Sequence, residues 1–420
     1  DIYPATDLQQ GLLFHGMLEE GRGVYVTQLR MTLSGPLDKA ALVAAWQTAI
    51  ERHAILRTHF EWRHGGKALQ VVRRRAMLPF AEHDWSAAEG GDAYEGRLAD
   101  WLAEDLARGF DSAGAPLMRV NLFARPDGRH DHVWTCHHAL LDGWASAQLL
   151  GEVMAAYTKG PAAELPPVVP YRDYIAWLKR QPSAEDWWRA RLAEVADPAT
   201  LTGVIEAPCG DDAAGPVFEQ GLGRELSERL RRAAQRHQLT LATLMQGALA
   251  ILIARYGGRP QVAYGVTVSG RPAELAGVET MVGLFINSLP VLCEVRGDEP
   301  LAQWLARLQA GNIELRQYEH TALTDVQRWA GRSGDALFDT LFVFENYPVD
   351  AELRKSEAPI TIDHVASEER SHYPLTIAVM PDDALVLRWT RNASKLDHAT
   401  VARLSAHYGE LLTQIAAAGE

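Results

Sequence analysis

The sequence predicts an α/β (α+β) protein built as two lobes. The chain has 420 residues, more than a single hydrophobic core usually holds, and 47% of them are hydrophobic while 23% are charged. Segments with strand and helix periodicity alternate along both halves of the chain. The proline-rich run 165–170 interrupts this pattern, so we expect one lobe at 1–170 and a second at 171–420.

The first half contains helices and strands that can be placed from periodicity and end signals. Asp38 is a plausible N-cap for a helix that ends near His53. Alternating apolar and β-branched residues predict strands at 55–60, 68–72, 117–124 and 132–136. Apolar residues at helical spacing then predict a helix from Trp144 to Tyr157.

The second half opens with a tryptophan-rich helix that begins at Tyr171. The segment 227–237 has the pattern of an amphipathic basic helix, and 239–256 is apolar almost all round, which predicts a buried helix. Central strands are expected at 261–268 and 284–295, and 201–215 is the next most linker-like stretch after the proline-rich run.

Composition excludes several classes of function. The net charge of −13 argues against a nucleic-acid partner, which needs a basic face. Cys136, Cys209 and Cys293 are odd in number and far apart, so neither a disulfide framework nor a metal site is expected, and the redox context indicates a cytoplasmic protein. No run is apolar for long enough to span a membrane. Because the chain opens without Met, we expect it to be excised from a longer polypeptide.

The run Cys-His-His-Ala-Leu-Leu-Asp-Gly-Trp at 136–144 is the strongest candidate for an active site. It lies where the strand 132–136 ends and the helix from Trp144 begins. Adjacent strand residues point to opposite faces, so only one of His137 and His138 can face a given cavity. Two equivalent catalytic bases are therefore not expected.

This run resembles the His-His-x-x-x-Asp-Gly motif of condensation domains of nonribosomal peptide synthetases. Chloramphenicol acetyltransferases share the shorter His-x-x-x-Asp core, so the run alone indicates the superfamily. Further segments resemble motifs of the condensation-domain family in the family's order: 3–15 (YPATDLQQGLLFH), 52–60 (RHAILRTHF), 171–177 (YRDYIAW), 281–290 (MVGLFINSLP) and 338–348 (FDTLFVFENYP). Ala54 departs from the second motif, where many relatives carry an acidic residue, which puts a role for that side chain in doubt.

The resemblance implies two chloramphenicol-acetyltransferase-like lobes in a V-shaped pseudo-dimer, with a tunnel between them. It also implies an amide-forming acyltransferase: an aminoacyl amine on a downstream carrier attacks the thioester of an aminoacyl or peptidyl group on an upstream carrier. The implied partners are the donor and acceptor peptidyl carrier domains and an adjacent adenylation domain. No cofactor or metal bound by this chain is expected, because the 4'-phosphopantetheine arms arrive on the carriers.

By this resemblance His138 is the catalytic histidine, and His137 packs beneath the strand and supports the turn. Two roles for His138 stay open: it takes the amine proton, or it only hydrogen-bonds and positions the amine. Gly143 is the second residue assigned to catalysis. Its N–H at a helix N-terminus could face the thioester oxyanion, and a plain turn glycine is the competing interpretation.

Two structural roles fit Asp142, and a role as general base is not expected. An aspartate just before a helix is a natural N-cap. In relatives this aspartate pairs with an arginine, for which Arg271 is the best match in this chain and Arg57 the second. Either interpretation makes Asp142 part of the scaffold.

Other residues are weaker candidates for contact with substrate or carrier. Trp144, Asn287 and Ser288 are possible contacts to substrate, and for Asn287 and Ser288 ordinary packing is an equally good interpretation. The arginine runs 73–75 and 229–236 are usually solvated faces, yet they are the best candidates by charge for carrier docking.

The motifs also resemble one subtype of the family. Trp144 follows Gly143 directly, which favours condensation over epimerisation, and heterocyclisation domains carry aspartates in place of the histidine pair. The opening motif is most like members that join a D-configured donor to an L-configured acceptor. The alternatives are a catalytically silent docking domain of the same family and a free-standing acyltransferase that uses coenzyme A.

Overall fold

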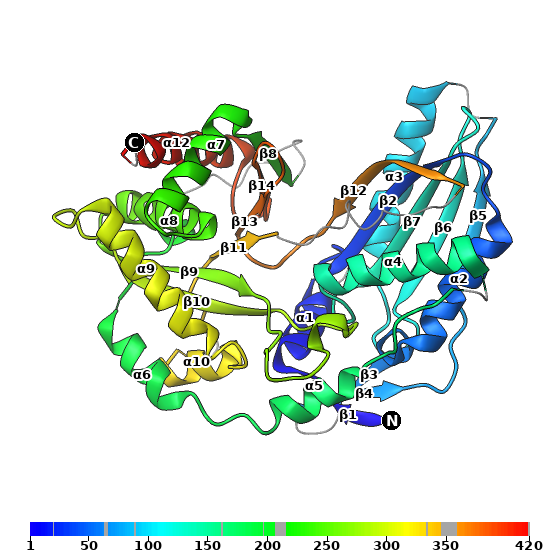
Figure 1. The fold of residues 1–420 in the computed structure, drawn as a ribbon, viewed down its shortest axis with the longest axis horizontal. Coiled ribbons are helices and arrows are strands. Elements are labelled where there is room, and N and C mark those ends of the chain that lie inside the picture. The colour runs from blue at the N-terminus through cyan, green and yellow to red at the C-terminus, as the bar shows by residue number, and fades with distance from the viewer. Residues whose placement is uncertain are drawn as a thin grey trace. The chain divides into compact units, whose positions relative to one another are not determined.

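A computed structural model describes residues 1–19, 21–62, 66–87, 90–160, 163–195, 197–205, 216–332, 335–345 and 359–418. The chain forms two compact units (Figure 1). Unit 1 comprises Asp1–Gln181, Arg271–Phe285 and Tyr347–Arg370, and unit 2 comprises Pro182–Gly270, Ile286–Asn346 and Ser371–Glu420. Cys209, the stretch 206–215 and the last three residues of the motif 338–348 lie outside the described residues.

Unit 1 contains two sheets. The larger sheet has the strand order β12-β2-β7-β6-β5, antiparallel except between β5 and β6. Its strands are β12 (Thr361–Glu368), β2 (Val26–Ser34), β7 (His130–His137), β6 (Met118–Ala124) and β5 (Phe80–Asp84). The smaller sheet, in the order β1-β4-β3, consists of β1 (Ile2–Pro4), β4 (Ala68–Val72) and β3 (Thr58–Trp62). The helices are α1 (Asp7–Leu18), α2 (Lys39–Arg52), α3 (Gly91–Arg108), α4 (Gly143–Lys159) and α5 (Tyr171–Leu178).

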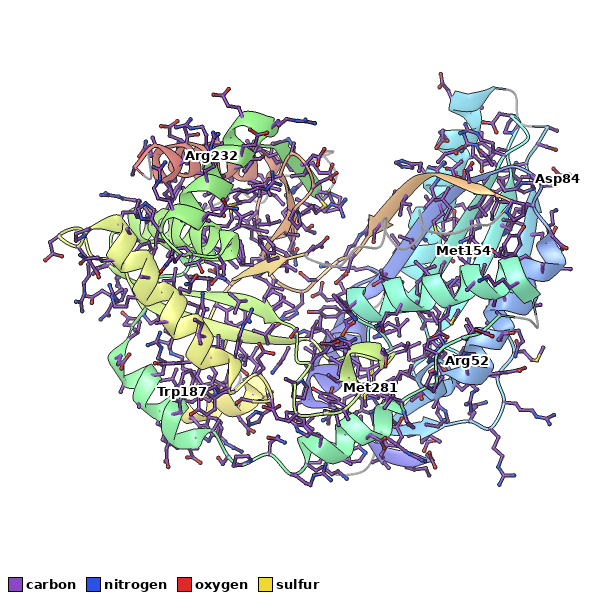
Figure 2. The ribbon with its side chains drawn as sticks, in the orientation of Figure 1. Arg52, Asp84, Met154, Trp187, Arg232 and Met281 are labelled. Carbon is purple, nitrogen blue, oxygen red and sulfur yellow. The ribbon has the colours of Figure 1, made fainter. Side chains whose placement is uncertain are left out.

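The central strand β7 is buried on both faces, which fixes the position of the histidines at its end. Trp134 and Cys136 lie in one hydrophobic cluster with residues of α2 and α4, including Met154, which Figure 2 labels. Val133 lies in a second cluster with Tyr94 of α3. Alternate side chains of a strand point to opposite faces, so helices on both faces hold β7 in place.

Unit 2 contains one six-stranded sheet in the order β10-β9-β11-β13-β14-β8. Its strands are β8 (Val217–Gly221), β9 (Gln261–Val268), β10 (Asn287–Glu294), β11 (Thr340–Phe344), β13 (Leu375–Met380) and β14 (Val386–Arg391). Its helices are α6 (Glu185–Glu194), α7 (Gly223–Arg236), α8 (Leu241–Gly257), α9 (Leu301–Arg316), α10 (Leu323–Trp329) and α12 (His398–Ala418). The apolar helix expected at 239–256 is α8, whose side chains lie in the core of unit 2.

The residues that make up each unit do not follow the single boundary that was expected after residue 170. The helix α5 belongs to unit 1, because the Tyr171 hydroxyl donates to the carbonyl oxygen of Leu284 at 2.5 Å and its ring packs on Phe285. The strand β12 also belongs to unit 1, since it pairs antiparallel with β2. Both contacts join residues far apart in the chain, which local composition does not reveal.

Two further elements test the sequence-based expectations. Asp38 is the N-cap of α2, as predicted, and its carboxylate accepts from the Ala41 N–H at 3.0 Å. The strand predicted at 55–60 is wrong at its start, because Ala54–Arg57 forms a 3₁₀ turn and β3 begins at Thr58. Ile55 and Leu56 are both buried by this turn, so their apolar character did not signal a strand.

No single helix among the described residues is long and apolar enough to cross a membrane. The helices α7 and α8 have the length and apolar composition of a membrane span only when they are taken together, and the chain bends by 104° between them.

Candidate active site

The turn from β7 to α4 is held by hydrogen bonds from three other parts of unit 1. The His138 N–H donates to the Tyr25 carbonyl at 2.8 Å, and the Gln9 side-chain amide donates to the Ala139 carbonyl at 2.9 Å. The Asp142 N–H donates to the Gly283 carbonyl at 3.3 Å. The two histidines and Asp142 are therefore presented on a backbone that has little freedom to move.

His137 is a buried, neutral histidine. Its Nδ1 accepts a hydrogen bond from the Ala139 N–H at 3.0 Å, so this nitrogen carries no proton. Burial, together with the charge of His138, lowers its pKa from 6.5 to about 4. This environment suits a residue that supports the turn.

Stability at acid pH offers a test of this role. His137 binds its proton near pH 6.5 in the unfolded chain and near pH 4 in the folded one, so its stabilising contribution is present above pH 6.5 and lost as the pH falls towards 4. His137→Asn keeps an acceptor for the Ala139 N–H but does not titrate. We expect the stability difference between wild type and this variant, from urea unfolding, to shrink between pH 6.5 and 4; a difference independent of pH would contradict a neutral His137.

His138 has both ring nitrogens engaged. Its Nδ1 lies 2.7 Å from the Leu141 carbonyl oxygen, and its Nε2 lies 3.2 Å from Oε1 of Glu369. Burial alone would lower the pKa of this imidazole, but the charge and hydrogen bond of Glu369 and the bond to Leu141 raise it from 6.5 to about 9. His138 differs from its neighbour because a carboxylate faces it.

Asp142 has every side-chain oxygen occupied by a scaffold contact. Oδ1 accepts from the Ala145 N–H at 2.7 Å and caps α4, and Oδ2 accepts from the Phe285 N–H at 3.0 Å. Arg271 Nη2 lies 3.2 Å from Oδ1 and 3.4 Å from Oδ2. With both oxygens engaged by these donors, the Asp142 side chain organises the site.

Arg271 joins the turn to the segment that follows β9. Its Nη1 donates to the carbonyl oxygens of Val278 and Met281, the latter labelled in Figure 2, and its guanidinium stacks on the Phe285 ring. Arg57, the second candidate partner of Asp142, is engaged elsewhere: it donates to backbone carbonyls of Ile50, Glu51, Arg73 and Arg74. Its guanidinium fixes the loop beside β3 and β4.

The other candidate residues have varied surroundings. Gly143 is the first residue of α4, so its N–H is among those with no acceptor inside the helix. The Trp144 indole donates to the Glu279 carbonyl at 3.0 Å. Asn287 and Ser288 lie at the start of β10 in unit 2, where the Asn287 amide donates to the carbonyls of Glu319 and Thr321.

Glu369 is the residue beside His138 that the sequence did not reveal. It follows β12, some 230 positions after the histidines, and no recognised motif covers it. Three consecutive charged residues at 368–370 were the only local signal, and such runs are usually solvated. The pairing of β12 with β2 brings Glu369 to the site.

The arrangement is suited to proton transfer and to stabilising negative charge. His138 supplies a titrating nitrogen at the end of a rigid strand, and the N-terminus of α4 supplies N–H groups beside it. No group of three or more His, Cys, Asp or Glu side chains among the described residues is arranged to hold a metal ion.

The comparisons with known proteins all indicate the same family. The sequence model of the family described as Condensation domain matches residues 1–420. The chain is 39% identical over 425 residues to a linear gramicidin synthase protein of Brevibacillus parabrevis, covering 99% of this chain and 8% of that protein. It is 37% identical over 464 residues to chondramide synthase of Chondromyces crocatus, covering 99% of this chain and 12% of that protein. The chain thus spans a small part of these relatives.

Solved structures show the same fold. The first condensation domain of the calcium-dependent antibiotic synthetase, in complex with a substrate analogue, matches with a TM-score of 0.80 at 19% identity, covering 99% of this chain and 96% of that one. A holo four-domain nonribosomal peptide synthetase bound to AMP and glycine matches with a TM-score of 0.82 at 14% identity, covering 99% of this chain and 33% of that one. The expected class, two acetyltransferase-like lobes of mixed helix and sheet, is confirmed.

Proposed function

The chain belongs to the condensation-domain family of nonribosomal peptide synthetases, and from that premise we propose that it joins two carrier-bound substrates through a peptide bond. The observation that carries the proposal is the turn 137–143, in which His138 stands at the end of a rigid strand and the Asp142–Arg271 pair fixes the start of α4. The amine of the acceptor is the nucleophile, so the site needs a proton acceptor and an oxyanion donor but no nucleophilic side chain.

His138 is the proton acceptor for the attacking amine in this proposal. Nε2 takes a proton from the amino group of the acceptor, which frees the nitrogen lone pair for attack on the thioester carbon. The Gly143 N–H, at the positive end of α4, donates to the oxygen of the tetrahedral intermediate. Holding both substrates on their 4'-phosphopantetheine arms then supplies much of the rate enhancement.

The proposed partners are an upstream donor carrier, a downstream acceptor carrier and the adenylation domain that loads the acceptor, all in the cytoplasm. The 4'-phosphopantetheine groups are parts of the substrates, and we propose that the chain holds no resident cofactor or metal of its own.

A reconstituted reaction tests this function against its alternatives. Purified chain is incubated with a donor carrier bearing an aminoacyl group and an acceptor carrier bearing another, and the dipeptide on the acceptor carrier is released and identified by mass spectrometry. A silent docking domain would bind both carriers without forming product. A free-standing acyltransferase would accept a coenzyme A thioester in place of the donor carrier.

The motif resemblance to D-donor members predicts a stereochemical preference. Inverting the α-carbon beside the thioester exchanges its side chain and hydrogen, which displaces the carbonyl from His138. We expect a D-configured donor to couple to an L-acceptor at least about tenfold faster than its L-enantiomer, equivalent to about 1.4 kcal/mol. Initial rates with matched donors measure this ratio, and faster coupling of the L-donor would overturn the subtype while leaving peptide bond formation intact.

A further inference from the structure

The carboxylate of Glu369 contacts the same nitrogen of His138 that must meet the acceptor amine. Because the Leu141 carbonyl accepts from Nδ1, that nitrogen carries a proton, and Nε2 needs a second proton to donate to Glu369. The hydrogen-bond network therefore assigns an imidazolium to His138. An imidazolium has no lone pair with which to take a proton from an amine.

Glu369 is held at this position by its neighbours in unit 1. The Tyr25 N–H donates to the Arg370 carbonyl at 2.8 Å, while the Tyr25 carbonyl accepts from the His138 N–H, also at 2.8 Å. The backbone of Tyr25 thus links the segment after β12 to the histidine turn through these two hydrogen bonds. Tyr25 has a positive φ of 60°, a strained conformation for a side chain of this type, which is common at functional sites.

The adjacent acidic residue, Glu368, has a different partner. Arg370 donates to Oε1 of Glu368 through Nε at 3.0 Å and through Nη2 at 2.7 Å. Glu369 faces His138 instead, and 44% of its side chain is exposed. A cation that arrives from solvent can therefore compete with His138 for this carboxylate.

We propose that Glu369 binds the α-ammonium group of the incoming acceptor and so exchanges His138 for the substrate as its ion-pair partner. This assignment rests on the function proposed above and deepens it. The α-ammonium nitrogen carries the positive charge of an aminoacyl acceptor and is also the atom that attacks the donor. A carboxylate beside the proton acceptor therefore selects an amine and holds it within reach of Nε2.

The exchange gives a balanced path for the protons. When the ammonium enters, His138 releases its Nε2 proton to solvent, because two cations beside one carboxylate repel each other. The ammonium then gives one proton to Nε2, which frees the nitrogen lone pair and restores the imidazolium. The amine attacks the carbonyl carbon, the C–N bond forms, the C–S bond breaks, and the departing thiolate takes the second proton from nitrogen. The net products are an amide, a thiol and one proton.

The state of His138 agrees with this path. Its pKa of about 9 makes His138 an imidazolium at neutral pH, and the charge responsible for raising this pKa is that of Glu369. His137, the other titrating group beside it, is neutral there because its pKa is lowered. A protonated His138 cannot activate water, which protects the donor thioester from hydrolysis until an acceptor arrives.

Binding of stable acceptor analogues tests the assignment. The acceptor carrier is loaded with an aminoacyl pantetheine in which an amide replaces the thioester, or with the α-hydroxyacyl compound of the same shape. We expect wild type to bind the amine analogue about tenfold more tightly than the hydroxyl analogue, as for a hydrogen bond between charged groups. In Glu369→Gln this preference falls to about twofold or less, because the amide is neutral. Glu368→Gln, the matched control, keeps the preference of wild type.

Kinetics and histidine titration complete the test. With reactive acceptor carriers, Glu369→Gln is expected to raise the acceptor KM about tenfold, and NMR should show the pKa of His138 well below its value in wild type. An unchanged preference for the amine analogue in Glu369→Gln, or a loss confined to kcat, would overturn the assignment. If wild type forms no amide, the proposed function fails, while the binding comparison still decides whether Glu369 recognises an ammonium.

Discussion

Replacing His138 with alanine is expected to lower the single-turnover rate of peptide bond formation by about 100-fold or more, the usual contribution of a positioned acid–base group. The loss follows from geometry, since Nε2 is the atom that meets the amine while Nδ1 is fixed by the Leu141 carbonyl. Quenched-flow reactions with preloaded carriers measure the rate and avoid limits from carrier loading.

Two comparisons make this result specific. His364→Ala removes an exposed histidine from β12 and should leave the rate unchanged. Binding of both carriers and the thermal midpoint of His138→Ala should match those of wild type. A folded His138→Ala protein that forms product at a rate near that of wild type would remove His138 from the chemistry.

Asp142→Ala is expected to cause the largest loss of stability, about 3–5 kcal/mol, because it leaves the Arg271 guanidinium without its carboxylate in a buried site. The Asp142 side chain is 1% exposed and that of Arg271 is 9% exposed, so water does not replace the lost partner. Asp142→Asn keeps an oxygen for the Ala145 N–H but loses the charge, so its loss should be smaller. Hydrogen exchange of α4 and β7 amides as a function of urea reports the stability of this region.

Asp38→Ala is the matched control for the cap. Asp38 accepts from the Ala41 N–H at the start of α2 and is exposed, so its removal should cost only about 1 kcal/mol. The difference between the two alanine variants then isolates the contribution of Arg271 and the Phe285 N–H. Equal losses for Asp142→Ala and Asp142→Asn, or a loss no larger than that of Asp38→Ala, would contradict the pairing.

The sequence alone was sufficient to predict the features of the fold and site that depend on local structure. The histidine turn could be placed between strand and helix because a β-branched run precedes it and a helix pattern follows it. The N-cap of α2 and the buried helix α8 were predictable for the same reason, since caps and apolar faces are local patterns.

What the sequence did not reveal depends on contacts between distant residues. Glu369 reaches His138 only because β12 pairs with β2, more than 300 positions earlier in the chain. The same pairing places this segment in unit 1, so a boundary drawn from the proline-rich run at 165–170 could not describe the units. Arg57 and Arg271 were both reasonable partners for Asp142, and only the fold shows that Arg57 is bound to backbone carbonyls.

In the proposed mechanism the acceptor amine attacks the donor thioester directly at His138, and no acyl group is ever attached to the enzyme. The most direct test is the intact mass of all three proteins during a single turnover. We predict that the acyl group moves from the donor carrier to the acceptor carrier, where it resists hydroxylamine as an amide, while the mass of this chain stays constant. An acyl group found on this chain, or an acceptor carrier whose mass never changes, would contradict direct transfer.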